Sequence, residues 1–214
     1  MTADLVLHGY WRSTASYRVR IALNLKGVDY RQVTHNLRTG EQYSAVYQFL
    51  NPQGLVPALQ TGKTTLTQSP AILEWLEERF PYPPLLPSNP EDKAIIRSMI
   101  ALVCCDIHPL NNLRVLNALG ENFGADETQI SAWIVRWIES GFAALEKLVV
   151  RHGSGFAFGD APTLADCCIV PQAYSANRFG VSLKPYPTLA ASVERCRQLT
   201  AFEIADPSNQ SDAD

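Results

Sequence analysis

A proline-rich segment near the middle of the chain constrains the fold more than any other feature. The run FPYPPLLPSNPED is crowded with proline between Pro81 and Pro90. Proline fixes φ and removes a backbone donor, so the run ends any helix that enters it and favours a semi-rigid, extended connection. We therefore predict two domains in this 214-residue chain, over residues 1–84 and residues 85–214.

The sequence before this boundary alternates strand and helix signals. Residues 5–7 form a short apolar run typical of a buried strand, and Tyr17, Ile21 and Leu25 share one face of a helix that Gly27 would end. Residues 30–34 then predict a second strand. A strand, helix and strand in this order predict a parallel pair with a right-handed connection.

The rest of the first domain predicts a hairpin and a helix. Residues 58–60 and 65–67 flank the turn sequence Thr-Gly-Lys-Thr, which favours an antiparallel hairpin and completes a mixed four-stranded sheet. Ser69 is a good N-cap with Pro70 at the first helical position, and the following helix is expected to end near Arg79.

Beyond the boundary the pattern is helical and predicts an all-α domain. Pro109 and Pro171 lie inside expected helices and should bend or break them locally. Thr163 and Asp166 have the spacing of a capping box, with Asp in place of the usual Glu. The polar last residues, ADPSNQSDAD, are expected to be frayed. The four expected helices span residues 91–119, 127–151, 163–178 and 188–199.

Composition excludes several classes of protein. A net charge of -3 argues against a broad nucleic-acid-binding face, which needs clustered Lys and Arg. No apolar run approaches the roughly eighteen residues that span a bilayer, and the N-terminus has no basic region followed by a long apolar stretch. The five cysteines lack the spacing of a metal site and are expected to be small buried hydrophobes kept reduced. We therefore expect a cytoplasmic protein without metal, membrane or nucleic-acid partners.

Three polar groups of residues stand out, each with two interpretations. A hydroxyl at the junction of the first strand and helix, from Ser13 or Thr14, can cap the helix or donate to an anion above the helix N-terminus. Val56 before Pro57 can leave backbone groups free to bind an extended peptide, or can belong to a rigid turn. Ser69 at a helix start can hold a small carboxylate or simply cap.

The third group lies in the sequence CDIHPLNNLR. In helical geometry His108, Asn111 and Asn112 project to related faces and form a polar patch on an apolar segment. The patch can belong to a binding site, or it can satisfy its own hydrogen bonds around the break at Pro109. The residues alone leave both interpretations open.

The chain resembles the zeta class of the glutathione transferase superfamily over nearly its whole length. The resemblance rests on several motifs in order: STASYRVR, NPQGLVPAL, QSPAILEWLEE, CDIHPLNNLRVL and FGDAPTLADCCIVPQ. It implies a thioredoxin-like N-terminal domain that binds glutathione as the cofactor, a helical C-terminal domain that completes an acidic-substrate site, and a homodimer.

The resemblance also implies roles for individual residues. Ser13 would be the catalytic hydroxyl partner of the glutathione sulfur, with Thr14 as the alternative. Cofactor contacts would come from Gln42, Val56, Gln68, Ser69, His108 and Asn112, and substrate carboxylates would be bound by Arg12, Arg114 and Arg178. Arg12 is also a catalytic candidate. Where zeta-class motifs often carry a cysteine, this sequence has Ala15, so a mechanism that needs a protein thiol there is disfavoured.

The activity that the resemblance implies is glutathione-dependent cis–trans isomerisation of a maleyl-type keto acid, either maleylacetoacetate or maleylpyruvate, in aromatic catabolism. One alternative is a glutathione transferase or dehalogenase that acts on small halogenated acids. The other is a non-catalytic module kept for protein interaction.

Overall fold

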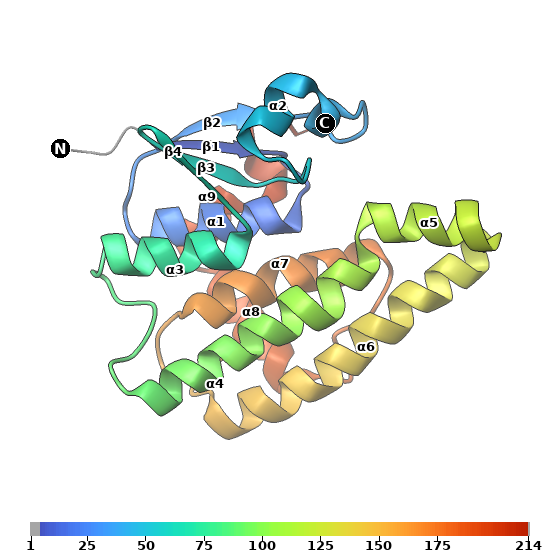
Figure 1. The fold of residues 1–214 in the computed structure, drawn as a ribbon. Coiled ribbons are helices and arrows are strands. Elements are labelled where there is room, and N and C mark those ends of the chain that lie inside the picture. Colours follow the sequence, from blue (N-terminus) through green and yellow to red (C-terminus); the bar gives the residue numbers. More distant parts are fainter. Residues whose placement is uncertain (1–4, 214) are drawn as a thin grey trace. The chain divides into compact units, whose positions relative to one another are not determined.

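The computed structural model describes residues 5–213, which divide into two compact units (Figure 1). The first unit contains the described residues up to Pro84 together with those from Gln198 onward. The second unit is Leu85–Arg197. The division between Pro84 and Leu85 falls inside the proline-rich segment, where the chain cannot continue a helix.

The first unit is built on a mixed sheet, as predicted. The strand order is β2-β1-β3-β4; β1 runs parallel to β2, and the other neighbours are antiparallel. Two residues, Gly62 and Lys63, close the β3–β4 hairpin. The strands are β1 (Leu5–Gly9), β2 (Arg31–Thr34), β3 (Ala58–Thr61) and β4 (Thr64–Thr67).

The strand register brings three chain segments to one end of this sheet. His8 near the end of β1 is opposite Ala58 at the start of β3, and Ala58 is opposite Thr67 at the end of β4. The residues that follow β1, precede β3 and follow β4 are therefore neighbours. These are the segments that carry Ser13, Val56 and Gln68.

Helices α1 (Thr14–Leu25) and α3 (Ser69–Arg79) lie side by side on one face of the sheet (Figure 1). α1 ends before Gly27, which has a φ of 61° that suits glycine. The prediction of Ser69 as the N-cap of α3 was wrong. Gln68 is the N-cap and Ser69 is the first helical residue, because Gln68 has a non-helical backbone.

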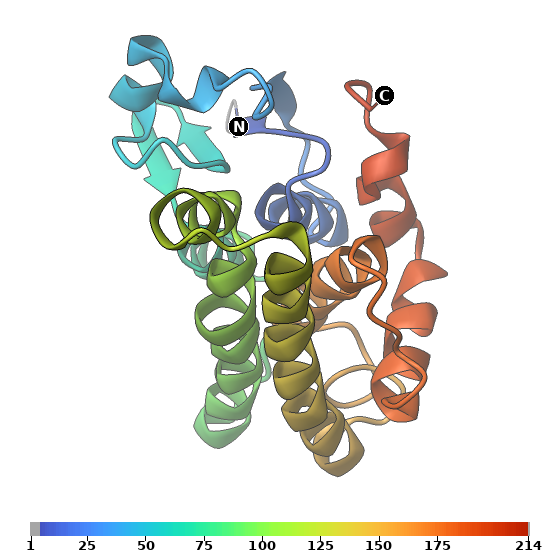
Figure 2. The same ribbon diagram turned by 90° about the vertical axis from the view of Figure 1, so that its right-hand side faces the viewer.

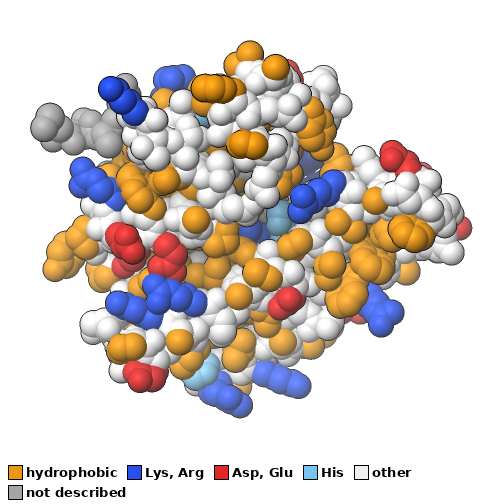
Figure 3. Space-filling model, in the orientation of Figure 1, with side chains coloured by type: hydrophobic (Ala, Val, Ile, Leu, Met, Phe, Trp, Pro, Cys, Tyr) orange, Lys and Arg blue, Asp and Glu red, His pale blue; other side chains and the backbone are white. Residues whose placement is uncertain are grey.

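A short helical segment between β2 and β3 was not predicted. It consists of the 3₁₀ helix η1 (Glu41–Tyr43) and α2 (Ala45–Leu50), with the Ser44 hydroxyl capping α2 by accepting from the Tyr47 N–H. Val46 and Phe49 are 80% and 89% exposed, so α2 has no apolar stripe facing a core that a periodicity argument could detect. Hydrophobic side chains are visible on the surface over α2 (Figure 3).

The last described residues pack onto the first unit, so the prediction of a frayed end was wrong for residues 205–213. They include the end of α9 (Thr200–Ala205) and η4 (Pro207–Asn209). α9 lies beside α1 (Figure 2) because the buried Arg20 guanidinium donates from Nε to the Ala205 carbonyl at 3.0 Å. Residue 214, the last of that predicted segment, lies outside the described residues.

The second unit is helical, as predicted, but its first expected helix is interrupted at Pro109. The α-helix α4 changes to a π-helix and then to a short 3₁₀ helix before α5 begins. Pro171 does not break α7, which is helical on both sides of it. The elements are α4 (Pro90–Ala101), η2 (Leu102–Ile107), η3 (His108–Asn111), α5 (Leu113–Phe123), α6 (Glu127–His152), α7 (Leu164–Arg178) and α8 (Pro187–Arg197).

The capping box at the start of α7 is confirmed. The Asp166 carboxylate accepts from the Thr163 N–H and hydroxyl, at 2.8 and 2.9 Å, and from the Ala157 N–H at 2.8 Å. The Thr163 hydroxyl accepts in turn from the Ala165 N–H. These bonds fix the entry of α7, the most buried helix of the second unit, to the preceding loop.

One described stretch, residues 90–123, is long and apolar enough to cross a membrane by length and composition alone. This differs from the sequence-based expectation of no such run. The stretch is not one continuous helix, because Asn112 has an extended backbone with ψ of 144° between η3 and α5. A single stretch of this kind, interrupted at Asn112, is weak evidence for a membrane-spanning helix.

The described cysteines are free thiols, but the expectation of uniform burial was wrong for two of them. Cys167, Cys168 and Cys196 are buried, whereas Cys104 is half-buried and Cys105 is exposed on η2. Cys104 and Cys168 bring their sulfur atoms to 3.9 Å. Among the described residues, no group of three or more His, Cys, Asp or Glu side chains could hold a metal ion.

Candidate active site

The loop between β1 and α1 presents a hydroxyl at the helix N-terminus. Ser13 is the N-cap of α1, and its Oγ accepts from the Ser16 N–H at 3.2 Å. A serine hydroxyl has two acceptor lone pairs and one hydrogen. Capping uses a lone pair, so the hydrogen stays available to an anion. The two interpretations of Ser13 are therefore compatible, and the half-exposed side chain can serve both.

The surroundings of Ser13 favour a negative ligand. The first turn of α1 contains no acidic residue, so the partial positive charge of the helix N-terminus is not neutralised from within the helix. Arg12 precedes Ser13, with its guanidinium carbon 5.6 Å from the centre of the Trp11 ring. Thr14, the alternative hydroxyl, is only 6% exposed. Ser13 is therefore the more accessible hydroxyl of this loop.

The segment before β3 presents free main-chain groups. The Val56–Pro57 peptide bond is cis, which the dipeptide alone did not predict. Within the part of the chain that the structure describes, neither the N–H nor the C=O of Val56 has a hydrogen-bond partner. The preceding carbonyl is fixed, because Leu55 accepts from the Tyr47 hydroxyl at 2.7 Å and from Asn51 Nδ2 at 2.6 Å. This rigid segment offers the edge that an added extended chain would use.

Gln68 has the only positive φ of any described residue other than glycine. Its φ is 66°, a conformation that side chains with a Cβ rarely adopt and that clusters at functional sites. Its Nε2 donates to Oε1 of Gln53, in the loop that also carries Val56. The strained backbone thus turns Gln68 toward the segment before β3.

Ser69 follows Gln68 and contacts a buried charge. Its side chain is 4% exposed, and its Oγ accepts from Nη1 of Arg18 at 3.1 Å. Arg18 is 2% exposed, and its Nε and Nη2 have no partner among the described groups. Since Ser69 accepts from Arg18, its own hydroxyl hydrogen is free to donate. The sequence did not single out Arg18, because an arginine in an amphipathic helix ordinarily lies on the solvated face.

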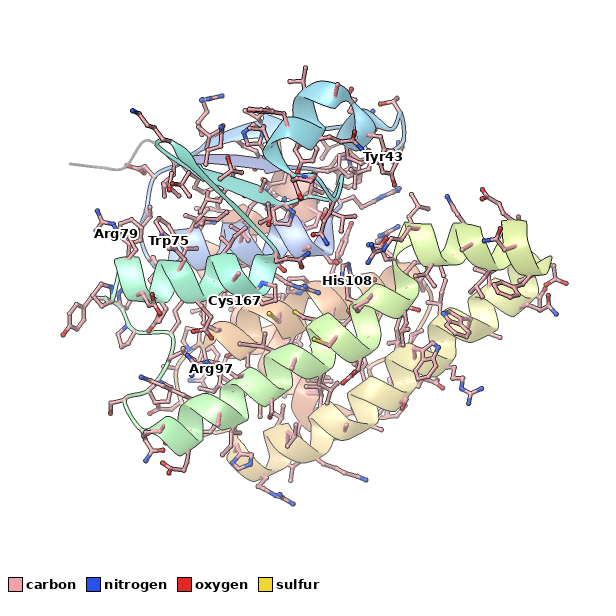
Figure 4. All side chains as sticks on the ribbon, in the orientation of Figure 1. Tyr43, Trp75, Arg79, Arg97, His108 and Cys167 are labelled. Atoms are coloured by element: carbon pink, nitrogen blue, oxygen red, sulfur yellow. The ribbon has the colours of Figure 1, made fainter. Side chains whose placement is uncertain are left out.

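Gln42, expected to contact the tripeptide, is buried in η1 at 5% exposure. Its Oε1 has no partner within the described part of the chain. The neighbouring Tyr43, labelled in Figure 4, lies over Gly54, where an added Cβ would come within 2.9 Å of the tyrosine ring. The side chain of Tyr43 is 57% exposed. A contact between Gln42 and a ligand therefore stays a prediction, and Tyr43 is the accessible side chain of this turn.

In the second unit the polar patch does not lie on one helix, so the expectation of related helical faces was wrong. His108 begins η3 (Figure 4), while Asn112 has an extended backbone and caps α5 by accepting from the Arg114 N–H at 3.2 Å. Asn111 between them is 9% exposed, and both of its side-chain polar atoms lack a partner among the described atoms. The break at Pro109 thus separates Asn112, which has an extended backbone, from His108 and Asn111, which share the 3₁₀ helix η3.

The two arginines predicted in the second domain are both exposed. Arg114 lies in the first turn of α5. Arg178 is the last residue of α7, and its guanidinium lies over two aromatic rings, 5.4 Å from the Phe179 centre and 6.0 Å from that of Tyr174. A guanidinium that stacks on aromatic rings keeps its charge, so Arg178 remains a cation at the end of α7.

Comparison with known proteins agrees with this arrangement. Residues 7–84 match the family model described as glutathione S-transferase, N-terminal domain. A maleylpyruvate isomerase of Ralstonia sp. is 50% identical over 97% of this chain and 99% of its own length. A solved holo structure of a maleylpyruvate isomerase, described as a bacterial glutathione S-transferase of the zeta class, has a TM-score of 0.95 at 49% identity, covering 98% of this chain and all of its own.

A second solved structure shows what one relative binds. The maleylacetoacetate isomerase of Methylobacterium extorquens AM1 was solved with glutathione and malonate, and it matches with a TM-score of 0.94 at 38% identity over 98% of this chain and 99% of its own. Identity at this level over nearly full length in both directions settles the family. The chain belongs to the zeta class of the glutathione transferases.

Proposed function

We propose that this protein is a glutathione-dependent isomerase that converts a maleyl-type keto acid, maleylacetoacetate or maleylpyruvate, to its fumaryl isomer in aromatic catabolism. The observation that carries the proposal is the Ser13 hydroxyl, whose oxygen caps α1 while its hydrogen stays available to an anion at the helix N-terminus. The relatives described above are named maleylpyruvate isomerase or maleylacetoacetate isomerase, and one of them was solved with bound malonate and glutathione.

Several groups of the first unit fit glutathione. The free N–H and C=O of Val56 suit the main chain of an extended tripeptide. The exposed Gln68 and the Ser69 hydroxyl, at the start of a helix without acidic residues in its first turn, suit a carboxylate. The same end of the sheet carries the Ser13 loop, as its register requires. These groups would hold the γ-glutamyl end, the cysteinyl main chain and the sulfur.

When bound, glutathione supplies a thiolate that adds reversibly to the cis double bond and so permits rotation about it. Ser13 would donate its hydroxyl hydrogen to the sulfur, and the N-terminus of α1 would add its partial positive charge. A free thiol titrates near pH 8.5, and both interactions favour the anionic form. Thr14 is the alternative donor, and Gln42 a further contact to the tripeptide.

The substrate carboxylates would be bound by arginines. Arg12 lies next to Ser13 in the first unit, and Arg114 and Arg178 belong to the second. A guanidinium binds a carboxylate through two parallel hydrogen bonds and keeps its charge at any physiological pH. His108 and Asn112 would complete the cofactor site. On this proposal residues 1–84 form the glutathione domain and residues 85–214 form the substrate domain, although residues 198–213 pack within the first unit.

The proposal includes a homodimer in the cytoplasm. The exposed apolar side chains of α2, Val46 and Phe49, offer a surface that a second copy would remove from water. Sedimentation of the purified protein tests the dimer, and a monomer at micromolar concentration would contradict it.

The test is an absorbance assay on maleylpyruvate and maleylacetoacetate with glutathione well below the substrate concentration. An isomerase completes many turnovers on each glutathione, because the thiol is regenerated. A transferase stops when glutathione is consumed, and a dehalogenase releases halide from a halogenated acid. The proposed function would be contradicted if the protein accelerated neither isomerisation. It would also be contradicted if each glutathione molecule supported only one turnover.

A further inference from the structure

The C-terminal segment reaches the loop that carries Arg12 and Ser13. The Trp11 N–H donates to Oδ2 of Asp212 at 3.0 Å, across 201 positions of sequence. The other oxygen of the same carboxylate, Oδ1, accepts from Nε2 of Gln32 in strand β2 at 3.4 Å. Asp212 therefore links the β1–α1 loop to β2 by contacts within the first unit.

The second backbone group of Trp11 is held from the opposite side. The buried Arg20 donates from Nη2 to the Trp11 carbonyl at 3.0 Å and from Nε to the Ala205 carbonyl, also at 3.0 Å. One guanidinium thus joins the loop to α9. Burial lowers the pKa of Arg20 to about 10, so it still carries its charge at neutral pH.

The tail between Ala205 and Asp212 is itself well ordered by hydrogen bonds. Asp206 Oδ1 accepts from the N–H and hydroxyl of Ser208 and so begins η4. Gln210 Nε2 donates to the carbonyls of Ile204 and Asp206, at 2.9 and 2.8 Å. The Ala213 N–H then donates to the Gln210 carbonyl. These bonds fix where Asp212 meets Trp11.

We propose that Asp212 is a positioning residue: its carboxylate holds the Trp11 amide and thereby fixes the orientation in which the loop presents Arg12 and the Ser13 hydroxyl. The inference rests on the proposed function for its catalytic consequence. Trp11 has one amide and one carbonyl, and with both fixed the two residues that follow it have little freedom. A hydroxyl and a guanidinium misplaced by even about 1 Å lose much of their effect on a reacting sulfur.

Two substitutions separate positioning from charge. Asp212→Ala removes the acceptor, while Asp212→Asn removes the charge but keeps an amide oxygen for Trp11, and Gln32 can turn its own amide to match. If Asp212 acted only as a nearby negative charge, both variants would lower the apparent pKa of bound glutathione equally. Positioning instead requires Asp212→Ala to raise that pKa and lower kcat, with Asp212→Asn close to wild type. Ser211→Ala, at the exposed neighbouring position, is the matched control.

Hydrogen exchange of the ligand-free protein tests whether Asp212 holds the Trp11 amide. Losing one hydrogen bond should speed exchange of the Trp11 amide about tenfold in Asp212→Ala, and the control should not change it. Unchanged exchange, or unchanged kcat and thiol pKa in Asp212→Ala, would overturn the inference. If wild-type protein shows no glutathione-dependent isomerisation, the proposed function fails separately, since the exchange measurement uses no ligand.

Discussion

Arg18 and Ser69 form a buried contact between α1 and α3, in which Nη1 of Arg18 donates to the Ser69 hydroxyl oxygen at 3.1 Å. The contact connects the interior of the first unit with a proposed carboxylate-binding hydroxyl. It orients Ser69 so that its hydrogen points away from the guanidinium, because a donor cannot face a donor.

Ser69→Ala should lower the free energy of unfolding by about 2 kcal/mol, because a buried charged donor loses its acceptor. Urea unfolding measures the change, with Ser131→Ala at an exposed position of α6 as the control. The same variant should bind glutathione more weakly. A stability equal to wild type would mean that the Arg18 contact contributes nothing in solution.

Ser13→Ala should raise the pKa of bound glutathione by about 1 to 2 units, since a hydrogen bond to a charged group contributes roughly 1.5–3 kcal/mol. Thiolate absorbance during a pH titration of the complex measures the shift, and kcat should fall with it. Thr14→Val is the control, because Thr14 is buried and the less accessible hydroxyl. If the thiol of bound glutathione titrated as in wild type in Ser13→Ala but with a shifted pKa in Thr14→Val, Thr14 and not Ser13 would be the hydrogen-bond donor to the sulfur.

Arg178→Ala should impair use of the keto acid while leaving glutathione affinity intact. Removing one charge-assisted contact to a carboxylate should reduce kcat/KM for the acid about tenfold or more. Isothermal titration with glutathione and steady-state kinetics with the acid separate the two effects. Arg178→Lys should recover only part of the loss, because an ammonium cannot form the paired hydrogen bonds of a guanidinium. Full efficiency in Arg178→Ala would remove this residue from the site.

A histidine pair in the first unit should make folding sensitive to mild acid. Nδ1 of His8 and Nε2 of His35 lie 2.9 Å apart, and His8 Nε2 lies 2.7 Å from the Gln60 amide oxygen, an acceptor. His8 therefore carries its proton on Nε2 and accepts from His35 when both rings are neutral. Burial, and secondarily the charge on His8, lower the pKa of His35, while Glu41 opposes the shift.

A lowered pKa in the folded state means that the unfolded chain binds the proton more readily. The contribution of His35 to stability is thus complete above its unfolded pKa of about 6.5 and is lost as the pH falls through the lower folded value. Denaturant midpoints measured from pH 7.5 down to 5 should decline, and His35→Gln should flatten that decline. His152→Gln in α6 is the control. Equal slopes in wild type and His35→Gln would contradict the prediction.

Local signals predicted the elements that local interactions determine. The hairpin around Gly62 and the capping box of Thr163 and Asp166 depend on residues a few positions apart, so the sequence alone predicts them. The mixed sheet followed from the order of strands and helix. The family resemblance added the glutathione-domain fold and the isomerase activity, which periodicity alone does not reach.

Tertiary contacts produced the features that sequence reasoning missed. Residues 205–213 are polar and read as frayed, yet they are ordered by partners such as Arg20 and Trp11 from the start of the chain. The positive φ of Gln68 could not be predicted either, because this position is not a glycine. Arg18 resembles a surface residue until α3 covers it. For the C-terminal residues and for Arg18, a distant segment and not a nearby one decides the conformation.

The packing of α9 against α1 also sets an order of events during synthesis. Residues 198–213 leave the ribosome more than a hundred positions after the sheet to which they belong, a delay on the order of ten seconds. Until they arrive, Arg20 lacks the Ala205 carbonyl and the Trp11 amide lacks its carboxylate. The nascent first unit therefore completes its β1–α1 loop only after the whole second unit has been translated.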